Sequence, residues 1–170
     1  MRKLFLLTLV ILASSAIVKA QTFGYLNTEK ILERIPEYNN AQQQIDRLKK
    51  QYEAQIDAEM KVVESMYNQY QAEKQALSGS QREIREGEII KKERSAKELQ
   101  KTFFGQEGAL SKRSLELLTP IKERVQTAIE KVAAEGGIIL VFDIATTQGI
   151  IYNNPANDLT AKVLKKLNIL

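Results

Sequence analysis

Apolar residues form a narrow, regularly spaced stripe through residues 36–118, flanked by charged and polar residues. Steps of four and three are typical of a coiled-coil seam, and a repeated step of four is a stutter that locally unwinds the supercoil. Ser78-Gly79-Ser80 interrupts the pattern. The sequence therefore predicts a long antiparallel helical hairpin, the arm, over residues 36–118 with its tip near 78–80. The seam expected on its first half is Ala41, Ile45, Leu48, Tyr52, Ile56, Met60, Val63, Tyr67 and Tyr70.

Two prolines lie in this helical pattern and are expected to act as hinges. Pro36 suits the first turn of the first helix, whereas Pro120 should kink the return helix between Leu117 and Ile121. Gly136-Gly137 should then end the helix. Beyond Pro120 the stripe continues through Ile121, Val125, Ile129 or Ala128, and Val132.

The two ends of the chain, residues 21–35 and 119–170, hold the residues able to build a β body. Three short strands are expected at 22–27, 138–143 and 149–153, with the turn of a hairpin at 146–149. The run IILVFD is continuously apolar, as in a strand covered on both faces. A closing helix should follow Asn154-Pro155, with Asp158 as N-cap and Leu159, Val163, Leu164 and Leu167 on one face. The fold class is thus α+β.

Three short strands leave exposed edges and too little core for one chain to be stable alone. Association of several chains into a closed barrel or sandwich would cover those edges, so the sequence predicts an oligomer. The residues expected in this oligomeric body core are Phe23, Tyr25, Ile139, Leu140, Val141, Phe142, Ile150, Ile151 and Tyr152.

Residues 1–20 have the pattern of a secretory signal peptide. Met1-Arg2-Lys3 is basic, Leu4 to Val18 is almost wholly apolar, and cleavage is expected after Ala20. A membrane anchor is the alternative, but the apolar run of about 15 residues is shorter than the roughly 20 that span a bilayer. Of the 25 basic residues, Arg2, Lys3 and Lys19 lie in this leader, which leaves 22 basic against 21 acidic side chains. The near-neutral balance argues against a general polyanion-binding role.

From end to end, the mature chain resembles the OmpH/Skp family of periplasmic chaperones. The order of elements carries the resemblance: leader, FGYLN, a long polar hairpin, LVFD, IYN, and NDLT before VLKKL. The resemblance implies a homotrimer whose β barrel is built from three chains, with helical arms around a central cavity. It also implies a periplasmic holdase that binds unfolded outer-membrane proteins without nucleotide or any other cofactor.

The resemblance implies an activity that depends on the surface of the cavity rather than on a short motif. Functional residues of other family members can therefore be assigned to positions of this chain only weakly. The candidates for client contact are the methionines and aromatic residues of the arm, since adaptable apolar side chains suit weak, broad binding. The alternative, for Met60 and Tyr67 especially, is that they belong to the seam inside the hairpin. The adjacent Phe103 and Phe104 cannot both lie in one narrow seam. The candidates are Met60, Met66, Tyr67, Tyr70, Phe103 and Phe104.

A basic cluster of Lys91, Lys92, Arg94 and Lys97 could make weak contact with lipopolysaccharide phosphates or a membrane surface. Glu88, Glu93 and Glu98 are interleaved with it, which favours intrahelical pairing on a solvated face instead.

Other functions have little support in the sequence. The chain has no His and no Cys, and neither a P-loop nor a GxSxG motif occurs, so an enzyme is not expected. Asp143 ends a strand and is expected to accept turn hydrogen bonds rather than do acid–base work. Nucleic-acid binding is not expected, because basic and aromatic residues are not interleaved. The remaining alternative is an envelope adaptor whose coiled coil docks one fixed partner.

Overall fold

A computed structural model describes residues 22–169 of the chain, which form two compact units. One unit is Leu32–Arg124, and the other comprises the described residues on either side of it. The predicted arm boundaries of 36 and 118 lie a few residues inside the first unit. The proposed signal peptide lies outside the described residues. No helix between residues 22 and 169 is long and apolar enough to cross a membrane.

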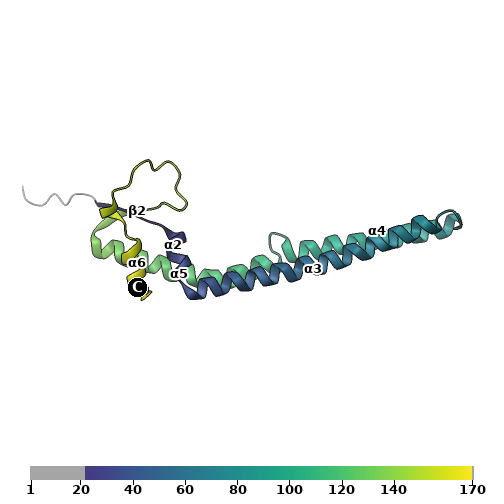
Figure 1. Cartoon of the computed structure of the whole chain (residues 1–170), viewed down its shortest axis with the longest axis horizontal. Coiled ribbons are helices and arrows are strands. Elements are labelled where there is room, and N and C mark those ends of the chain that lie inside the picture. The colour runs from purple at the N-terminus through teal and green to yellow at the C-terminus, as the bar shows by residue number, and fades with distance from the viewer. Residues whose placement is uncertain (1–21, 170) are drawn as a thin grey trace, which may run out of the picture. The chain divides into compact units, whose positions relative to one another are not determined.

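Four helices follow one another from the first strand to the second. α2 (Thr28–Glu33) is a short helix, α3 (Pro36–Glu73) runs for 38 residues, α4 (Gly79–Phe104) returns beside it, and α5 (Ala109–Gly136) completes the return. Pro36 occupies the first turn of α3, as predicted. Figure 1 shows α3 and α4 lying side by side as the predicted antiparallel pair.

The tip of the hairpin is closed by a capping box. α3 ends at Glu73, a few residues before the predicted turn, and Ser78 is the N-cap of α4. The Gln81 N–H donates to the Ser78 hydroxyl, and the Ser78 N–H donates to the Gln81 side chain. This reciprocal pair satisfies backbone donors that would otherwise be free at the helix start.

The seam between α3 and α4 departs from the predicted stripe in its second half. Ala41 and Tyr70 are buried and Val63 is half-buried, but Met60 and Tyr67 are exposed. The positions turned toward α4 are instead Glu59 and Met66. The prediction followed hydrophobicity alone, whereas the structure places a charged residue in the seam and pairs it across the hairpin.

The return arm is interrupted at residues 105–108, not at Pro120. α5 passes through Pro120 without a break, and the helix turn there is exposed, so water can satisfy the carbonyl that proline leaves without a donor. A β-carbon on Gly105 would lie 2.4 Å from the Lys101 carbonyl oxygen, and one on Gly108 would lie 2.7 Å from that of Phe103. These close approaches explain why the sequence places glycine at the interruption.

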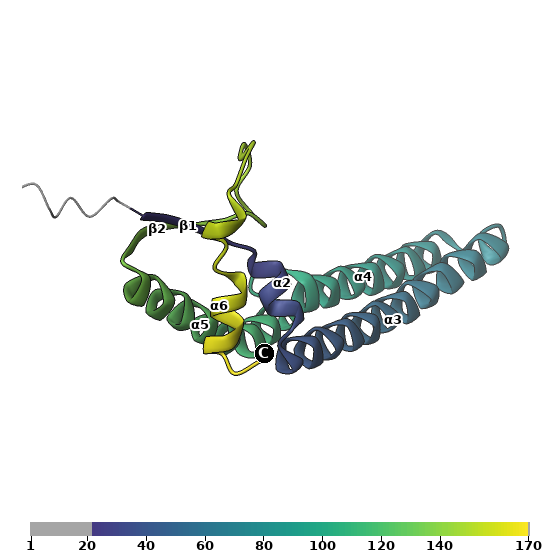
Figure 2. The same ribbon diagram turned by 60° about the vertical axis from the view of Figure 1, so that its left-hand side comes forward.

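The body contains two strands, β1 (Thr22–Leu26) and β2 (Ile138–Asp143), which pair in parallel. Gly137 has a φ of +61°, which releases the chain from α5 into β2 as predicted. The predicted third strand and its hairpin are wrong for the single chain: residues 147–154 form a loop with no strand (Figure 2). β1 pairs with one edge of β2, and residues 147–154 do not pair with the other edge, which stays free within the described chain.

The core of the body lies between β1, α5 and the closing helix. The 3₁₀ turn η1 (Pro155–Asn157) leads to α6 (Thr160–Lys166). The Leu159 N–H donates to the Tyr25 carbonyl at 2.8 Å, and the Asn27 N–H donates to the Thr160 hydroxyl at 3.1 Å. The side chains buried in this unit are Tyr25, Leu26, Ile31, Val125, Ala128, Val132, Leu159, Val163 and Leu164. Ala128, rather than Ile129, therefore continues the buried stripe.

Asp143 joins three parts of the body. The Thr28 N–H and hydroxyl donate to its carboxylate at 3.1 and 2.5 Å, and the Ala145 N–H donates at 3.0 Å. Partial burial opposes its ionisation, but these hydrogen bonds prevail and hold the pKa of Asp143 below its usual value. Its predicted role as a hydrogen-bond acceptor at the turn is confirmed, and the link to the start of α2 is an addition.

Candidate functional site

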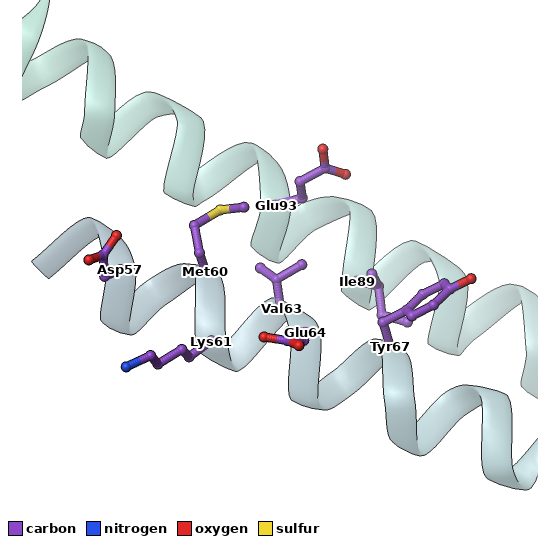
Figure 3. Close-up of a pocket in the computed structure, with 8 residues that line it drawn as sticks. All are labelled: Asp57, Met60, Lys61, Val63, Glu64, Tyr67, Ile89 and Glu93. Atoms are coloured by element: carbon purple, nitrogen blue, oxygen red, sulfur yellow. The ribbon is translucent and has the colours of Figure 1, made fainter. Parts of the chain in front are cut away.

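A groove runs along one side of the hairpin between α3 and α4. It encloses about 540 Å³, and Figure 3 shows Met60 and Val63 rising from α3 toward α4. Val63 and Ile89 are half-buried and form its floor, while Met60 and Tyr67 remain 45% and 52% exposed. The lining residues are Asp57, Met60, Lys61, Val63, Glu64, Tyr67, Ile89 and Glu93.

An ion pair explains why Met60 and Tyr67 stay outside the seam. Lys92 on α4 reaches Glu59 on α3, with 2.5 Å between the charged atoms, and both side chains are about two-thirds covered. Glu59 thus takes the seam position one residue before Met60, so Met60 is displaced to the groove side. Of the two alternatives for Met60 and Tyr67, the structure supports the exposed one.

Charged groups along the groove are mainly acidic. Asp57 and Glu64 are exposed on α3, and neither makes an ion pair within residues 22–169. Glu93 on α4 pairs with Lys97 at 2.6 Å. Lys61 is the one cation of the lining, and Figure 3 shows its side chain directed away from α4. The groove therefore combines an apolar floor with a rim of carboxylates.

Met66 and Tyr70 lie deeper than Met60 and Tyr67. Met66 is half-buried and Tyr70 is only 4% exposed. The Tyr70 hydroxyl donates to the Glu86 carboxylate, and this hydrogen bond raises the pKa of Tyr70. Lys74 lies over the Tyr70 ring, 5.4 Å from its centroid. Through these contacts Tyr70 joins α3 to α4 near the tip of the hairpin.

Phe103 and Phe104 both pack against one residue of α3. The Phe103 ring stacks on Tyr52 with centroids 4.0 Å apart, and the Phe104 ring meets Tyr52 edge-on at 6.3 Å. Tyr52 thus accommodates two adjacent residues that a narrow seam could not. Since both rings are half-buried, their contact with a client stays a prediction.

The basic cluster on α4 is partly neutralised. Lys97 pairs with Glu93 within the helix and Lys92 pairs across the hairpin, while Lys91 and Arg94 are exposed without an ion pair in the described chain. Intrahelical pairing therefore accounts for one of the four cations. Contact of the remaining cations with phosphate groups stays a prediction.

The residues predicted for an oligomeric body core are mostly uncovered in the single chain. Ile151 is wholly exposed, Tyr152 is 80% exposed and Ile139 is 58% exposed. Phe23, Leu140, Phe142 and Ile150 are also exposed, Val141 is half-buried, and Tyr25 alone is buried. The expectation that β2 is covered on both faces is therefore wrong within one chain. Burial of these side chains between chains stays a prediction.

Comparison with known proteins identifies the family. The model of the family described as "Outer membrane protein (OmpH-like)" matches residues 22–167. The chain belongs to the OmpH-like family. It is 26% identical over 156 residues to the chaperone protein Skp of Yersinia enterocolitica, and the match covers 92% of both chains. The predicted resemblance is thus confirmed.

The fold is shared with a solved structure of this family. An OmpH-like protein from Caulobacter crescentus matches with a TM-score of 0.65 at 13% identity, covering 88% of this chain and 85% of that one. The long helical hairpin and the two-stranded sheet are therefore features of the OmpH-like fold. The Yersinia relative is named a chaperone, which is not an enzyme class. Residues 22–169 hold no group of three His, Cys, Asp or Glu that could ligate a metal.

Sequence reasoning found the apolar side of the groove but missed its charged rim. Met60 and Tyr67 were candidates because of their residue type, whereas Asp57 and Glu64 were not candidates and Glu93 was expected to pair within its helix. A usable signal was present: Asp57 and Glu64 precede Met60 and Tyr67 by three residues each, which places them on neighbouring positions of one helix face.

Proposed function

We propose that this protein is an ATP-independent periplasmic holdase. It binds unfolded outer-membrane β-barrel proteins between its arms and prevents their aggregation in transit. Membership of the OmpH-like family and the chaperone name of the Yersinia relative support the class of activity. The observation that carries the proposal is the groove, in which Met60 and Tyr67 stay exposed although the hairpin has a seam that could bury them.

The physical properties of the groove suit a holdase. An unfolded β-barrel protein exposes apolar residues that alternate with polar ones over long stretches. Methionine and tyrosine offer adaptable apolar contact without a fixed shape. An open groove on a helical arm holds such segments weakly, which allows release without an energy source.

The working unit in this proposal is a homotrimer. Ile139, Ile151 and Tyr152 expose apolar surface in the single chain. Neighbouring copies would cover that surface and the free edge of β2. The leader at residues 1–20 supports export, and the family resemblance supports the periplasm.

A dilution assay tests the activity. A urea-unfolded outer-membrane barrel is diluted with and without the protein, and light scattering is followed without nucleotide. We expect suppression at near-stoichiometric trimer for more than one client. The double variant Met60→Ser, Tyr67→Ser should weaken suppression, whereas the control Val62→Ser, Ile84→Ser removes exposed apolar residues outside the groove and should not. No suppression by the folded oligomer at several-fold excess would favour the adaptor function.

A further inference from the structure

We propose that the arm groove prefers segments of unfolded polypeptide in which apolar residues alternate with lysine or arginine. This inference rests on the proposed holdase function and names the chemistry of the segments that the groove selects. Its basis is the acidic rim beside the apolar floor.

The floor receives one face of an extended segment. Val63 and Ile89 lie at its base, and Met60 and Tyr67 are available on the α3 side. Successive side chains of an extended chain point to opposite faces, so apolar residues at alternate positions can all meet this floor. The intervening side chains then point away from the floor, and only a long, flexible side chain can bend back to the rim.

Two of the three rim carboxylates, Asp57 and Glu64, form no ion pair in the described chain. Asp57 and Glu64 are seven residues apart, which is two helical turns or about 10.5 Å along α3. Neither has an ion-pair partner within residues 22–169, and Glu93 adds a third carboxylate that Lys97 occupies. Lys61 is directed away from α4 and the floor (Figure 3). A bound segment therefore meets a negative local field.

Lysine and arginine fit this arrangement better than other polar residues. Their aliphatic stems can cover apolar surface such as Met60 while the charged end bends to a carboxylate. An acidic residue at the same place would face Asp57 or Glu64 at close range without compensation.

The groove and the whole chain predict opposite preferences, so the proposal can be tested cleanly. Without the leader, 22 basic side chains stand against 21 acidic ones, and the exposed cations Lys91 and Arg94 do not line the groove. Attraction by this small positive net charge would slightly favour acidic segments. A preference for basic segments that depends on Asp57 and Glu64 therefore arises from the rim.

The experiment compares two synthetic peptides in which apolar residues alternate with serine. In one peptide some of the serines are replaced by lysine, and in the other the same serines are replaced by glutamate. Binding to the protein purified after export is measured by fluorescence anisotropy at low and at physiological ionic strength. We expect the lysine peptide to bind roughly three- to tenfold more tightly at low ionic strength, and the difference to shrink with salt.

Two double variants locate the effect. Asp57→Asn, Glu64→Gln should abolish the difference between the peptides. The control Glu83→Gln, Glu98→Gln makes the same change in net charge at exposed positions of α4 outside the groove and should leave the difference intact. Loss of the difference in both variants, equal binding of both peptides, or tighter binding of the glutamate peptide would overturn the proposal. So would failure of both peptides to bind, and the light-scattering assay then decides separately whether the protein is a holdase.

Discussion

The arm and the body are built from similar residues but held together in different ways. In the body, Leu26, Ile31 and Val163 are almost wholly buried, and hydrogen bonds such as Thr28–Asp143 join residues 115 positions apart. In the arm, the hairpin has one narrow seam, and Ala41, Tyr70 and Ala96 are its buried apolar residues between positions 36 and 104. The comparison shows that the arm buries few apolar side chains, whereas the body combines a buried core with exposed apolar residues on β2 and in the loop that follows it.

The largest effect on stability is expected when a buried leucine of the body is shortened. Leu26→Ala should lower the free energy of unfolding by about 3 kcal/mol, because its side chain is 1% exposed and leaves a cavity. Ile56→Ala in the half-buried seam should cost about half as much. Urea unfolding followed by circular dichroism at fixed protein concentration measures both. Equal losses would mean that the seam is packed as tightly as the body.

A second test adds a methyl group to a packed position instead of shortening a side chain. Gly24→Ala should destabilise the protein by about 2 kcal/mol, since its new β-carbon would lie 2.6 Å from Leu159 Cδ1, a buried atom. Gly79→Ala is the matched change in the arm. Nothing lies within 4 Å of the position of its β-carbon, and thermal unfolding should show no loss of stability.

A third test uses pH to separate the two regions. Because hydrogen bonds hold the folded-state pKa of Asp143 below its unfolded value of about 3.9, its contribution is present above that pH and is lost as pH falls through the folded-state value. Asp143→Asn should cost about 1 kcal/mol at neutral pH. The variant should also unfold with a weaker dependence on pH below about 4. Asp46→Asn, on the exposed surface of α3, should retain the pH dependence of the parent protein.

A fourth test asks how much the aromatic contact contributes to the arm. A double-mutant cycle of Tyr52→Leu and Phe103→Leu should give a coupling of about 1 kcal/mol, because the two rings stack 4.0 Å apart. Amide hydrogen exchange in α4 reports the change locally. Additive effects of the two substitutions would show that the stack adds nothing beyond burial.

The smallest effect is expected from the ion pair across the hairpin. A cycle of Glu59→Gln and Lys92→Gln should give a coupling of at most about 0.5 kcal/mol, since both side chains are partly solvated. The informative readout is the exposure of Met60: if the pair keeps Met60 outside the seam, Glu59→Gln should let Met60 turn toward α4 and should slow its oxidation. Unchanged oxidation of Met60 in that variant would contradict this explanation.

Local signals in the sequence predicted much of the fold. Ile138–Asp143 has the predicted bounds, Pro36 starts α3, and Gly136-Gly137 ends α5, because each depends on short-range backbone preferences. The sequence predicted a kink at Pro120, and it marked Gly105 and Gly108 as a flexible joint or a weak spot, where the return helix is in fact interrupted. A proline on an exposed turn costs one hydrogen bond, whereas the glycines permit a backbone approach that no other residue allows.

The features that could not be predicted depend on partners distant in sequence. Glu59 enters the seam because Lys92 reaches it from the other helix, and hydrophobic patterning assigns no seam position to a charged residue. The strand expected at 149–153 is absent for a related reason. Within the described chain the partner of β2 is β1, which is far away in sequence, and not the segment that follows β2 after a short turn.

The parallel pairing of β1 with β2 has a consequence for the order in which the molecule folds. Contacts between the first and last thirds of a chain have high contact order and form slowly, whereas a helical hairpin closed by a five-residue turn is local and fast. As the chain emerges from a ribosome or a translocation pore, the hairpin is complete long before Ile138 appears. Thr22–Leu26 must meanwhile wait as an unpaired strand. Its first native partner is therefore among the last residues of the chain to arrive.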